Sequence, residues 1–245
     1  MNGIYALGQY FLFVAEIFKT PKHIKLLRKI TVQSLFSIGI ESIPIVFAVS
    51  IFMGGIITIQ TANGFSNPLI PLYAVGFAAR ESIILEFSPT IICLILAGKV
   101  GSNIASEIGT MRITDQIDVL DVMGVNSKQF LLLPKIAASL LVFPFLVGFS
   151  MVTALTGGYV IGIISGAVTG YEFIYGAQSF FKPWTLYYSF TKVIVFAFLI
   201  SSVSGYFGYH MKGGALEVGK SSTKSVVYAN VLILLMDLVL TKLFF

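Results

Sequence analysis

Residues 136–171, IAASLLVFPFLVGFSMVTALTGGYVIGIISGAVTGY, contain no aspartate, glutamate, lysine or arginine. A second stretch without these residues lies between Glu41 and Arg80. A helix needs about 20 apolar residues to cross the hydrocarbon core of a bilayer, so each stretch can hold at least one span. The whole chain is 56% hydrophobic and 11% charged, against roughly 25% charged residues in a soluble domain. The composition therefore predicts an all-α integral membrane protein.

The hydrophobic pattern predicts one transmembrane domain, residues 1–245, with an N-terminal interfacial helix and about five transmembrane helices. Residues 1–30 combine an aromatic, apolar segment with a basic linker, as in helices that lie in the membrane interface. Spans are expected at about 39–61, 73–98, 130–164, 185–208 and 223–244, with an amphipathic excursion at 166–184. Pro89 is expected to kink the second span, and Pro134 or Pro144 to break the third, which is too long for one straight crossing.

The lysines and arginines favour one orientation. With five spans, 12 of the 16 lie on the same side as the N-terminus: Lys19, Lys22, Lys25, Arg28, Lys29, Lys99, Arg112, Lys128, Lys135, Lys212, Lys220 and Lys224. The positive-inside rule makes this side cytoplasmic, which places the 166–184 excursion in the periplasm. The net charge of +5 is thus explained by topology and does not indicate a nucleic-acid partner.

A polar segment, KVGSNIASEIGTMRITDQIDVLDVMGVNSK, runs from Lys99 to Lys128 between the apolar blocks. A segment this acidic crosses a bilayer only at high cost, so we expect it to face water or a partner protein. Asp115, Asp118 and Asp121 are spaced three apart, as carboxylates that hold Mg²⁺ against a diphosphate can be. The alternative is a solvated or partner-facing surface, because no second acidic cluster accompanies them.

Other chemical motifs are weak. Gly214–Ser221, GALEVGKS, fits the phosphate-loop pattern, but it follows an apolar helix instead of a strand, so we predict a glycine-rich turn that opens the last helix. The two histidines, His23 and His210, form no recognisable relay, and Cys93 is the single cysteine. No cofactor or metal site is therefore expected.

Glycines recur every fourth residue at Gly158, Gly162, Gly166 and Gly170. On a helix this spacing gives a smooth stripe that lets another backbone approach closely. Packing within the chain and a contact between subunits both remain open.

Charged residues within spans are costly and therefore suggest function. Glu86 lies one turn before Pro89 in the second span, where a hydrogen-bonded structural role and a cavity-lining role are both open. Asp237 lies deep in the fifth span, and we expect a structural role there, with bonds to neighbouring hydroxyls. Lys192 is expected near a span end, where its ammonium could reach the interface.

Several of these segments resemble one family. They are EFSPT from Glu86, AGKVGS from Ala97, ASEIGTMRITDQID from Ala105, MGVN from Met123, LPK from Leu133, GGALEVGKSSTKSVV from Gly213 and LMDLVLT from Leu235. Together they are similar to MlaE-type permeases, the membrane subunits of ABC transporters that move lipids with an MCE-domain partner. The resemblance covers the chain from about residue 30.

The resemblance implies a non-enzymatic, multi-pass subunit of the bacterial inner membrane. It implies a homodimer with cytoplasmic ABC ATPase subunits, a periplasmic MCE-domain protein and a phospholipid substrate. Residues 101–118 would form a cytoplasmic coupling helix that docks on the ATPase through Glu107, Ile108, Gly109, Thr110, Met111, Arg112 and Asp115. Two other functions stay open: an ion-coupled secondary carrier with Glu86 as its proton site, and an intramembrane lipid-modifying enzyme.

The same resemblance implies a lipid cavity lined by the first, second and fifth spans. Glu86 and Phe87 match the family pattern, with Phe87 facing acyl chains. The family usually has arginine directly before that glutamate, whereas this chain has Leu85. Arg80, on the same helix, is the expected substitute.

Overall fold

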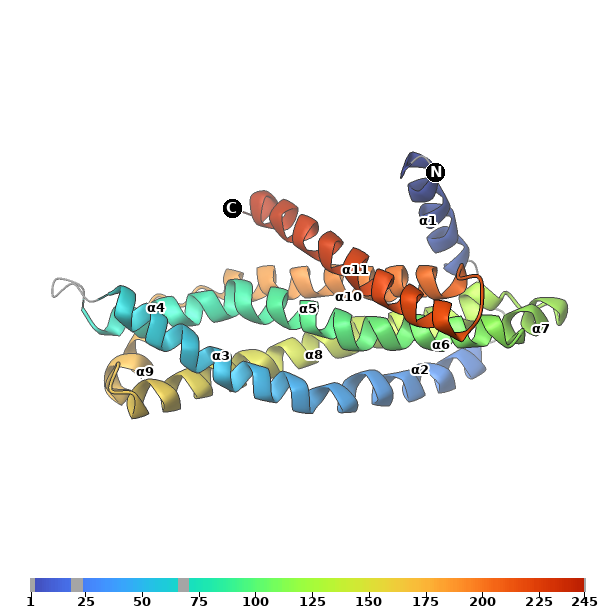
Figure 1. Cartoon of the computed structure of the whole chain (residues 1–245). Coiled ribbons are helices and arrows are strands. Elements are labelled where there is room, and N and C mark those ends of the chain that lie inside the picture. Colours follow the sequence, from blue (N-terminus) through green and yellow to red (C-terminus); the bar gives the residue numbers. More distant parts are fainter. Residues whose placement is uncertain (1–2, 19–23, 66–70, 245) are drawn as a thin grey trace. The chain divides into compact units, whose positions relative to one another are not determined.

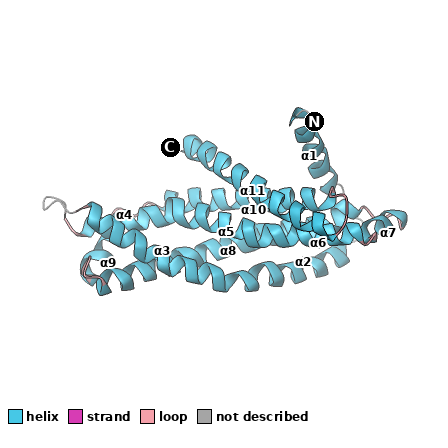
Figure 2. Cartoon of the chain, in the orientation of Figure 1, coloured by secondary structure: helices cyan, strands magenta, loops and turns pink. Residues whose placement is uncertain are grey.

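The computed structural model describes residues 3–18, 24–65 and 71–244, and within these ranges it contains helices and turns but no strand (Figure 2). Five helical segments are long and apolar enough to cross a membrane: Leu26–Gly64, Tyr73–Ile113, Ser127–Ile164, Pro183–Tyr209 and Ala215–Phe244. The prediction of an all-α membrane protein with about five spans is confirmed.

The elements follow one another in a simple order (Figure 1). They are α1 (Gly3–Ile17), α2 (Ile24–Gly39), η1 (Ile40–Ser42), α3 (Ile43–Gly64), α4 (Tyr73–Ser82), η2 (Ile83–Ile91), α5 (Ile92–Leu96), η3 (Ala97–Gly101), α6 (Ser102–Ile113), α7 (Gln116–Val122), α8 (Ser127–Ile164), α9 (Gly170–Gln178), α10 (Pro183–Tyr209) and α11 (Ala215–Phe244). Several spans begin earlier than the hydrophobic pattern suggests, since amphipathic turns extend them past their apolar cores.

The second span continues into the polar segment without a break. Helical structure runs from Tyr73 to Ile113, and Asp115, with φ 56°, separates α6 from α7. Around Pro89 the helix widens to π geometry, so that the Ile92 N–H donates to the carbonyl of Phe87, five residues earlier. Proline cannot donate to the carbonyl four residues before it, and a wider turn also relieves the clash of its ring with that carbonyl.

The prediction that Pro134 or Pro144 breaks the third span is wrong, because α8 is continuous over 38 residues. Each proline removes one backbone hydrogen bond, and the neighbouring turns and packed helices hold the helix in spite of that loss. At 1.5 Å per residue α8 is about 57 Å long. It is thus longer than the hydrocarbon core, and its N-terminal end belongs to the polar segment.

The chain forms two compact units, which we call the first and second unit. The first comprises residues 1–41, 94–143 and 195–242, and the second comprises residues 42–93, 144–194 and 243–245. Both draw on α8 and α10, which contribute one part to each.

Helix α8 packs closely on α3 within the second unit. A Cβ added at Gly54 would lie 1.9 Å from the carbonyl oxygen of Ala154, and one at Gly157 would lie 2.3 Å from that of Ile51. Gly158 and Gly162 both approach Thr58 of α3. The first two glycines of the predicted stripe thus serve packing within the chain.

The rest of the predicted stripe does not lie on the same helix. Helix α8 ends at Ile164, and Gly166 has φ 70° in the turn that follows, while Gly170 begins α9. A positive φ is available to glycine at little cost. Gly166 therefore ends the helix instead of extending its smooth face.

Candidate functional site

Glu86 and Lys192 form an ion pair inside the second unit. Lys192 Nζ, from α10, lies 2.9 Å from Glu86 Oε1, on η2. The lysine side chain is fully buried, whereas 53% of the glutamate side chain is exposed. Lys192 Nζ also donates to the carbonyl of Leu85 at 3.4 Å and lies 4.5 Å from the ring centroid of Tyr188.

Pro89 contributes to this pair. Leu85 is the residue whose carbonyl loses its α-helical donor when position 89 is proline. That carbonyl accepts a hydrogen bond from Lys192. The ammonium of Lys192 therefore donates to the carbonyl that Pro89 leaves without its α-helical donor.

The exposed face of Glu86 cannot rest against lipid tails at low cost. Glu86 is the one charged residue between positions 82 and 98, in a stretch dominated by isoleucine and leucine. A carboxylate in hydrocarbon costs several kcal/mol, even when it is partly compensated. This face of η2 is therefore suited to a polar cavity or to a partner surface.

Arg80 does not serve as the counter-charge of Glu86. Its buried guanidinium donates to the carbonyls of Ala177 and Ser179 at 2.9 and 2.8 Å and pairs with Glu81. These two carbonyls belong to the end of α9 and the residue just after it, where helices leave carbonyls without intrahelical donors. Arg80 thus holds α9 against α4, and Lys192 is the cation that pairs with Glu86.

Two other intramembrane residues were singled out from the sequence, Phe87 and Asp237. Phe87, expected to face acyl chains, is 3% exposed and packs inside the second unit. Asp237, in α11, is partly buried, and its backbone carbonyl accepts from the hydroxyl of Thr241 at 2.8 Å.

Only part of the expected coupling segment lies at the surface of the chain. Glu107, Thr110 and Asp115 are exposed, and Met111 and Arg112 are partly buried. Ile108 and Gly109 are buried in the first unit, where a Cβ at Gly109 would lie 3.3 Å from Val218 and 3.4 Å from Met211. A docking partner could therefore contact the polar members of this set directly, while the buried members fix α6 in place.

Ion pairs organise the surface of this segment. Lys135 Nζ, from α8, lies 2.6 Å from Glu107 Oε2, and Arg112 Nη1 lies 2.7 Å from Asp118 Oδ1. Asp121 accepts from the backbone N–H of Ser127 at 3.4 Å. The three spaced aspartates thus differ in their roles, and no group of three potential metal ligands occurs among the described residues.

The phosphate-loop pattern is not a loop in the structure. Gly213 and Gly214 form the turn, and α11 begins at Ala215, so Gly219, Lys220 and Ser221 are helical. Lys220 pairs with Glu217 at 2.6 Å. A phosphate loop needs consecutive free backbone N–H groups, which this helix uses internally.

Helix α1 is fixed to the first unit by contacts that the sequence pattern did not reveal. Phe13 is buried between Tyr206, Tyr209 and His210, with ring centroids 5.1–5.4 Å away. Glu16 pairs with Lys128, and Tyr10 and Ser202 share a hydrogen bond of 2.7 Å. Tyr5, Phe11 and Leu12 are exposed on α1, and Phe18 is exposed just after it. Exposed apolar side chains of this kind are typical of helices in a membrane interface.

His210 lies at this junction. Burial is the main cause that lowers the pKa of its imidazole. The hydrogen bond with the Tyr206 carbonyl opposes this, while the nearby cations Lys128 and Arg112 lower the pKa further and Glu16 raises it slightly. The neutral imidazole is therefore favoured where α1 is docked.

A sequence model of the family described as permease MlaE matches residues 31–243. The chain belongs to this permease family. It is 31% identical over 243 residues to a probable ABC transporter permease protein of Rickettsia prowazekii (strain Madrid E), with 99% of this chain and 92% of the relative covered. A probable ABC transporter permease protein of Synechocystis sp. (strain ATCC 27184 / PCC 6803 / Kazusa) is 30% identical over 248 residues, covering 99% and 89%.

A plant protein is also similar to the permease. Trigalactosyldiacylglycerol 1, chloroplastic, of Arabidopsis thaliana is 32% identical over 218 residues, which are 88% of this chain and 61% of that protein. The chain is thus a multi-pass permease of an ABC transporter, a class whose members work with ATPase partners.

Lys192 is the functional candidate that the sequence interpretation missed in this permease. It lies well inside Pro183–Tyr209, not at a span end, and it is buried. A cation within a span indicates a paired or cavity-facing group by default. That rule, applied to Lys192 as it was to Glu86, would have marked Lys192 as a candidate, but it does not identify Glu86 as its partner.

Proposed function

We propose that this permease is the membrane subunit of an ATP-driven phospholipid transporter. In this proposal two copies form the lipid-binding cavity, cytoplasmic ATPase subunits dock at residues 101–118, and an MCE-domain protein binds on the periplasmic side of the bacterial inner membrane. The observation that carries the lipid cavity is the half-exposed Glu86 carboxylate beside the buried Lys192.

A lipid fits the surroundings of this pair. Helix α3, in the same unit, exposes Phe47, Phe52 and Ile56. An apolar wall with one polar pair suits an amphiphile, whose acyl chains meet the wall while a headgroup donor meets the exposed carboxylate oxygen. The name of the Arabidopsis relative contains that of a glycerolipid, which supports a lipid substrate here.

A second copy of the chain is the partner we propose for the exposed apolar faces. Helix α11 is poorly covered by its own chain and exposes Val231, Leu234, Leu235 and Leu238. In lipid, helices associate through close packing and polar contacts, so a cavity between two copies needs both.

Coupling to an ATPase would use the continuous helix from Tyr73 to Ile113. Its exposed cytoplasmic end carries Glu107, and its other part carries Glu86. In this proposal, a displacement imposed at one end of the continuous helix is transmitted along it. The Glu107–Lys135 bridge supports this end from α8.

The lipid is tested by mass spectrometry of phospholipids that copurify with the intact transporter. We expect bound phospholipid with the wild type and at least a fivefold loss with Glu86→Lys, which places two cations together. Lys182→Glu, an exposed change outside the pair, serves as the control. Equal phospholipid content in Glu86→Lys and wild type would contradict the proposed cavity.

The docking surface is tested by ATPase copurification. Glu107→Arg reverses the exposed charge and also places two cations together at Lys135. The swapped variant, Glu107→Arg with Lys135→Glu, rebuilds the bridge within the chain but keeps the altered charge at position 107. We expect both variants to lose the ATPase, whereas recovery in the swapped variant would show that Glu107 acts only within the chain.

Energy supply is tested in the same preparation. The purified permease alone should hydrolyse no ATP, and lipid movement should stop without the ATPase. Movement that continued without the ATPase but ceased with the proton gradient would favour an ion-coupled carrier with Glu86 as its proton site.

A further inference from the structure

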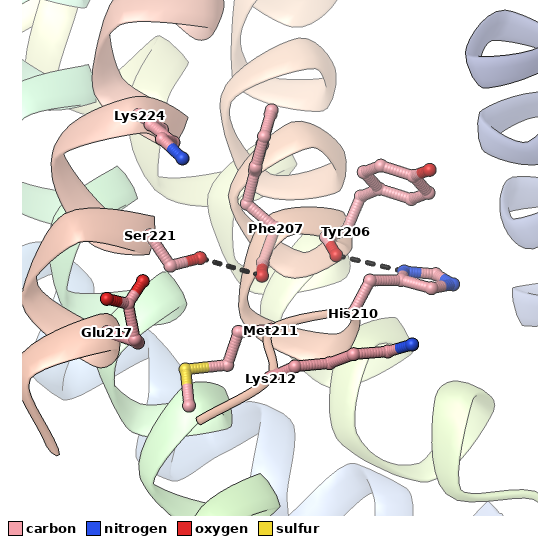
Figure 3. Close-up of a pocket in the computed structure, with 8 residues that line it drawn as sticks. All are labelled: Tyr206, Phe207, His210, Met211, Lys212, Glu217, Ser221 and Lys224. Atoms are coloured by element: carbon pink, nitrogen blue, oxygen red, sulfur yellow. Dashed lines mark hydrogen bonds between the residues drawn. The ribbon is translucent and has the colours of Figure 1, made fainter. Parts of the chain in front are cut away.

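A cavity of about 360 Å³ lies in the first unit at the end of a membrane-spanning helix. Its lining comes from the last turn of α10, the turn that follows, and the first turns of α11 (Figure 3). This volume lies within the range of small-molecule sites. The cavity shares no residue with the Glu86–Lys192 pair.

The charged groups of this cavity leave a net positive lining. Lys212 and Lys224 line it from the turn and from α11, and neither forms an ion pair within the described ranges. The carboxylate that lines it, Glu217, is paired with Lys220, which lies outside the lining. Figure 3 shows Lys224 and Lys212 at opposite edges, with Glu217 on the α11 side.

Part of the cavity lining is apolar. Met211 is buried, and Phe207 stacks on Tyr228 with ring centroids 5.0 Å apart. The hydroxyl of Ser221 donates to the carbonyl of Phe207 at 2.8 Å, which joins α11 to α10 beside the cavity. An anion alone would use the lysines but not this apolar wall.

We propose that this cavity binds the phosphate group of an anionic glycerophospholipid at the membrane surface. The two lysines attract the phosphate from opposite edges of the cavity, the glycerol region lies against Met211 and Phe207, and the acyl chains follow α11 at the exposed Val227. Basic pockets between transmembrane helices at the water–membrane boundary have the chemistry that such headgroups require. The site is separate from the proposed transport cavity, so an experiment can refute one of the two proposals and leave the other standing.

The proposal is tested by native mass spectrometry of the intact, detergent-purified permease titrated with phosphatidylglycerol. The variant Lys212→Gln with Lys224→Gln should bind phosphatidylglycerol about 10- to 30-fold more weakly than the wild type, because each lysine near the surface adds roughly a factor of five. Both side chains are exposed, so the fold should persist, as an unchanged thermal midpoint would show.

The control variant removes two exposed lysines elsewhere, Lys29→Gln with Lys242→Gln. It should bind as the wild type does, and equal weakening in both double variants would overturn the proposal. Phosphatidylcholine, which has the phosphate but no net charge, should bind at least tenfold more weakly. Displacement of phosphatidylglycerol by millimolar inorganic phosphate would identify a soluble anion as the ligand and overturn the lipid assignment.

Discussion

Replacing Lys192 by methionine tests the Glu86–Lys192 ion pair most directly. Methionine fills a volume similar to that of the lysine stem, so packing around α10 is largely kept. The change removes the ammonium 2.9 Å from Glu86 Oε1 and its contact with the ring of Tyr188. The Glu86 carboxylate then stays in an apolar stretch without this neighbouring positive charge.

The size of the effect follows from burial. Removing one partner of a fully buried ion pair costs about 3–5 kcal/mol, and an exposed pair is worth at most about 1 kcal/mol. One partner is fully buried here and the other is 53% exposed, so we expect a loss of about 1–3 kcal/mol. For a chain of this size that is a fall of about 2–12 °C in the thermal midpoint.

The assay is thermal denaturation of the detergent-purified permease, followed by the monodisperse fraction after heating. Lys182→Met, an exposed lysine just before α10, should leave the midpoint within about 1 °C of wild type. Adding Glu86→Gln to Lys192→Met should recover part of the loss, since it removes the charge that lacks compensation. If the two changes simply add, the pair carries no coupling energy and the interpretation of the site fails.

Three further predictions concern contacts elsewhere in the chain. Arg80→Met should cost about 2–4 kcal/mol, because two carbonyls at the end of α9 lose their donor, and limited proteolysis should then cut near that helix first. Gly54→Ala should lower the thermal midpoint sharply since its Cβ would lie 1.9 Å from a carbonyl of α8, whereas Gly98→Ala, with open space around it, should not. The folded chain lowers the pKa of His210, so stability should fall as pH drops from about 6.5 toward that lower value, and His210→Gln should flatten this fall between pH 7.5 and 5.5.

The sequence predicts the membrane class and the number of spans because both depend on composition and length. Charge-free stretches around residues 42–79 and 136–171 are too long for anything but spans in a chain this hydrophobic. The position of Glu86 within its span also follows from the pattern. These properties are local, so one sequence is enough to find them.

What the sequence does not predict depends on contacts between distant segments. Lys192 and Glu86 lie 106 positions apart, and nothing local distinguishes a buried lysine from one that reaches the interface. Arg80 is near Glu86 in sequence, yet its guanidinium meets α9. The expected break at Pro134 or Pro144 does not occur, because α8 stays continuous where packed turns surround these prolines.

Pro89 is visible in the sequence, but the contact of Lys192 with the carbonyl of Leu85 beside it depends on the fold. Proline in an α-helix costs about 3 kcal/mol or more, so replacing it by alanine ordinarily stabilises a helix. At position 89 the alanine N–H could donate to the carbonyl of Leu85 and close the widened turn, in competition with Lys192. We therefore expect Pro89→Ala to gain less stability than Pro134→Ala, or to lose some, in the same thermal assay. If both raise the midpoint equally, the widened turn at Glu86 is an ordinary accommodation of proline and takes no part in holding the buried ammonium.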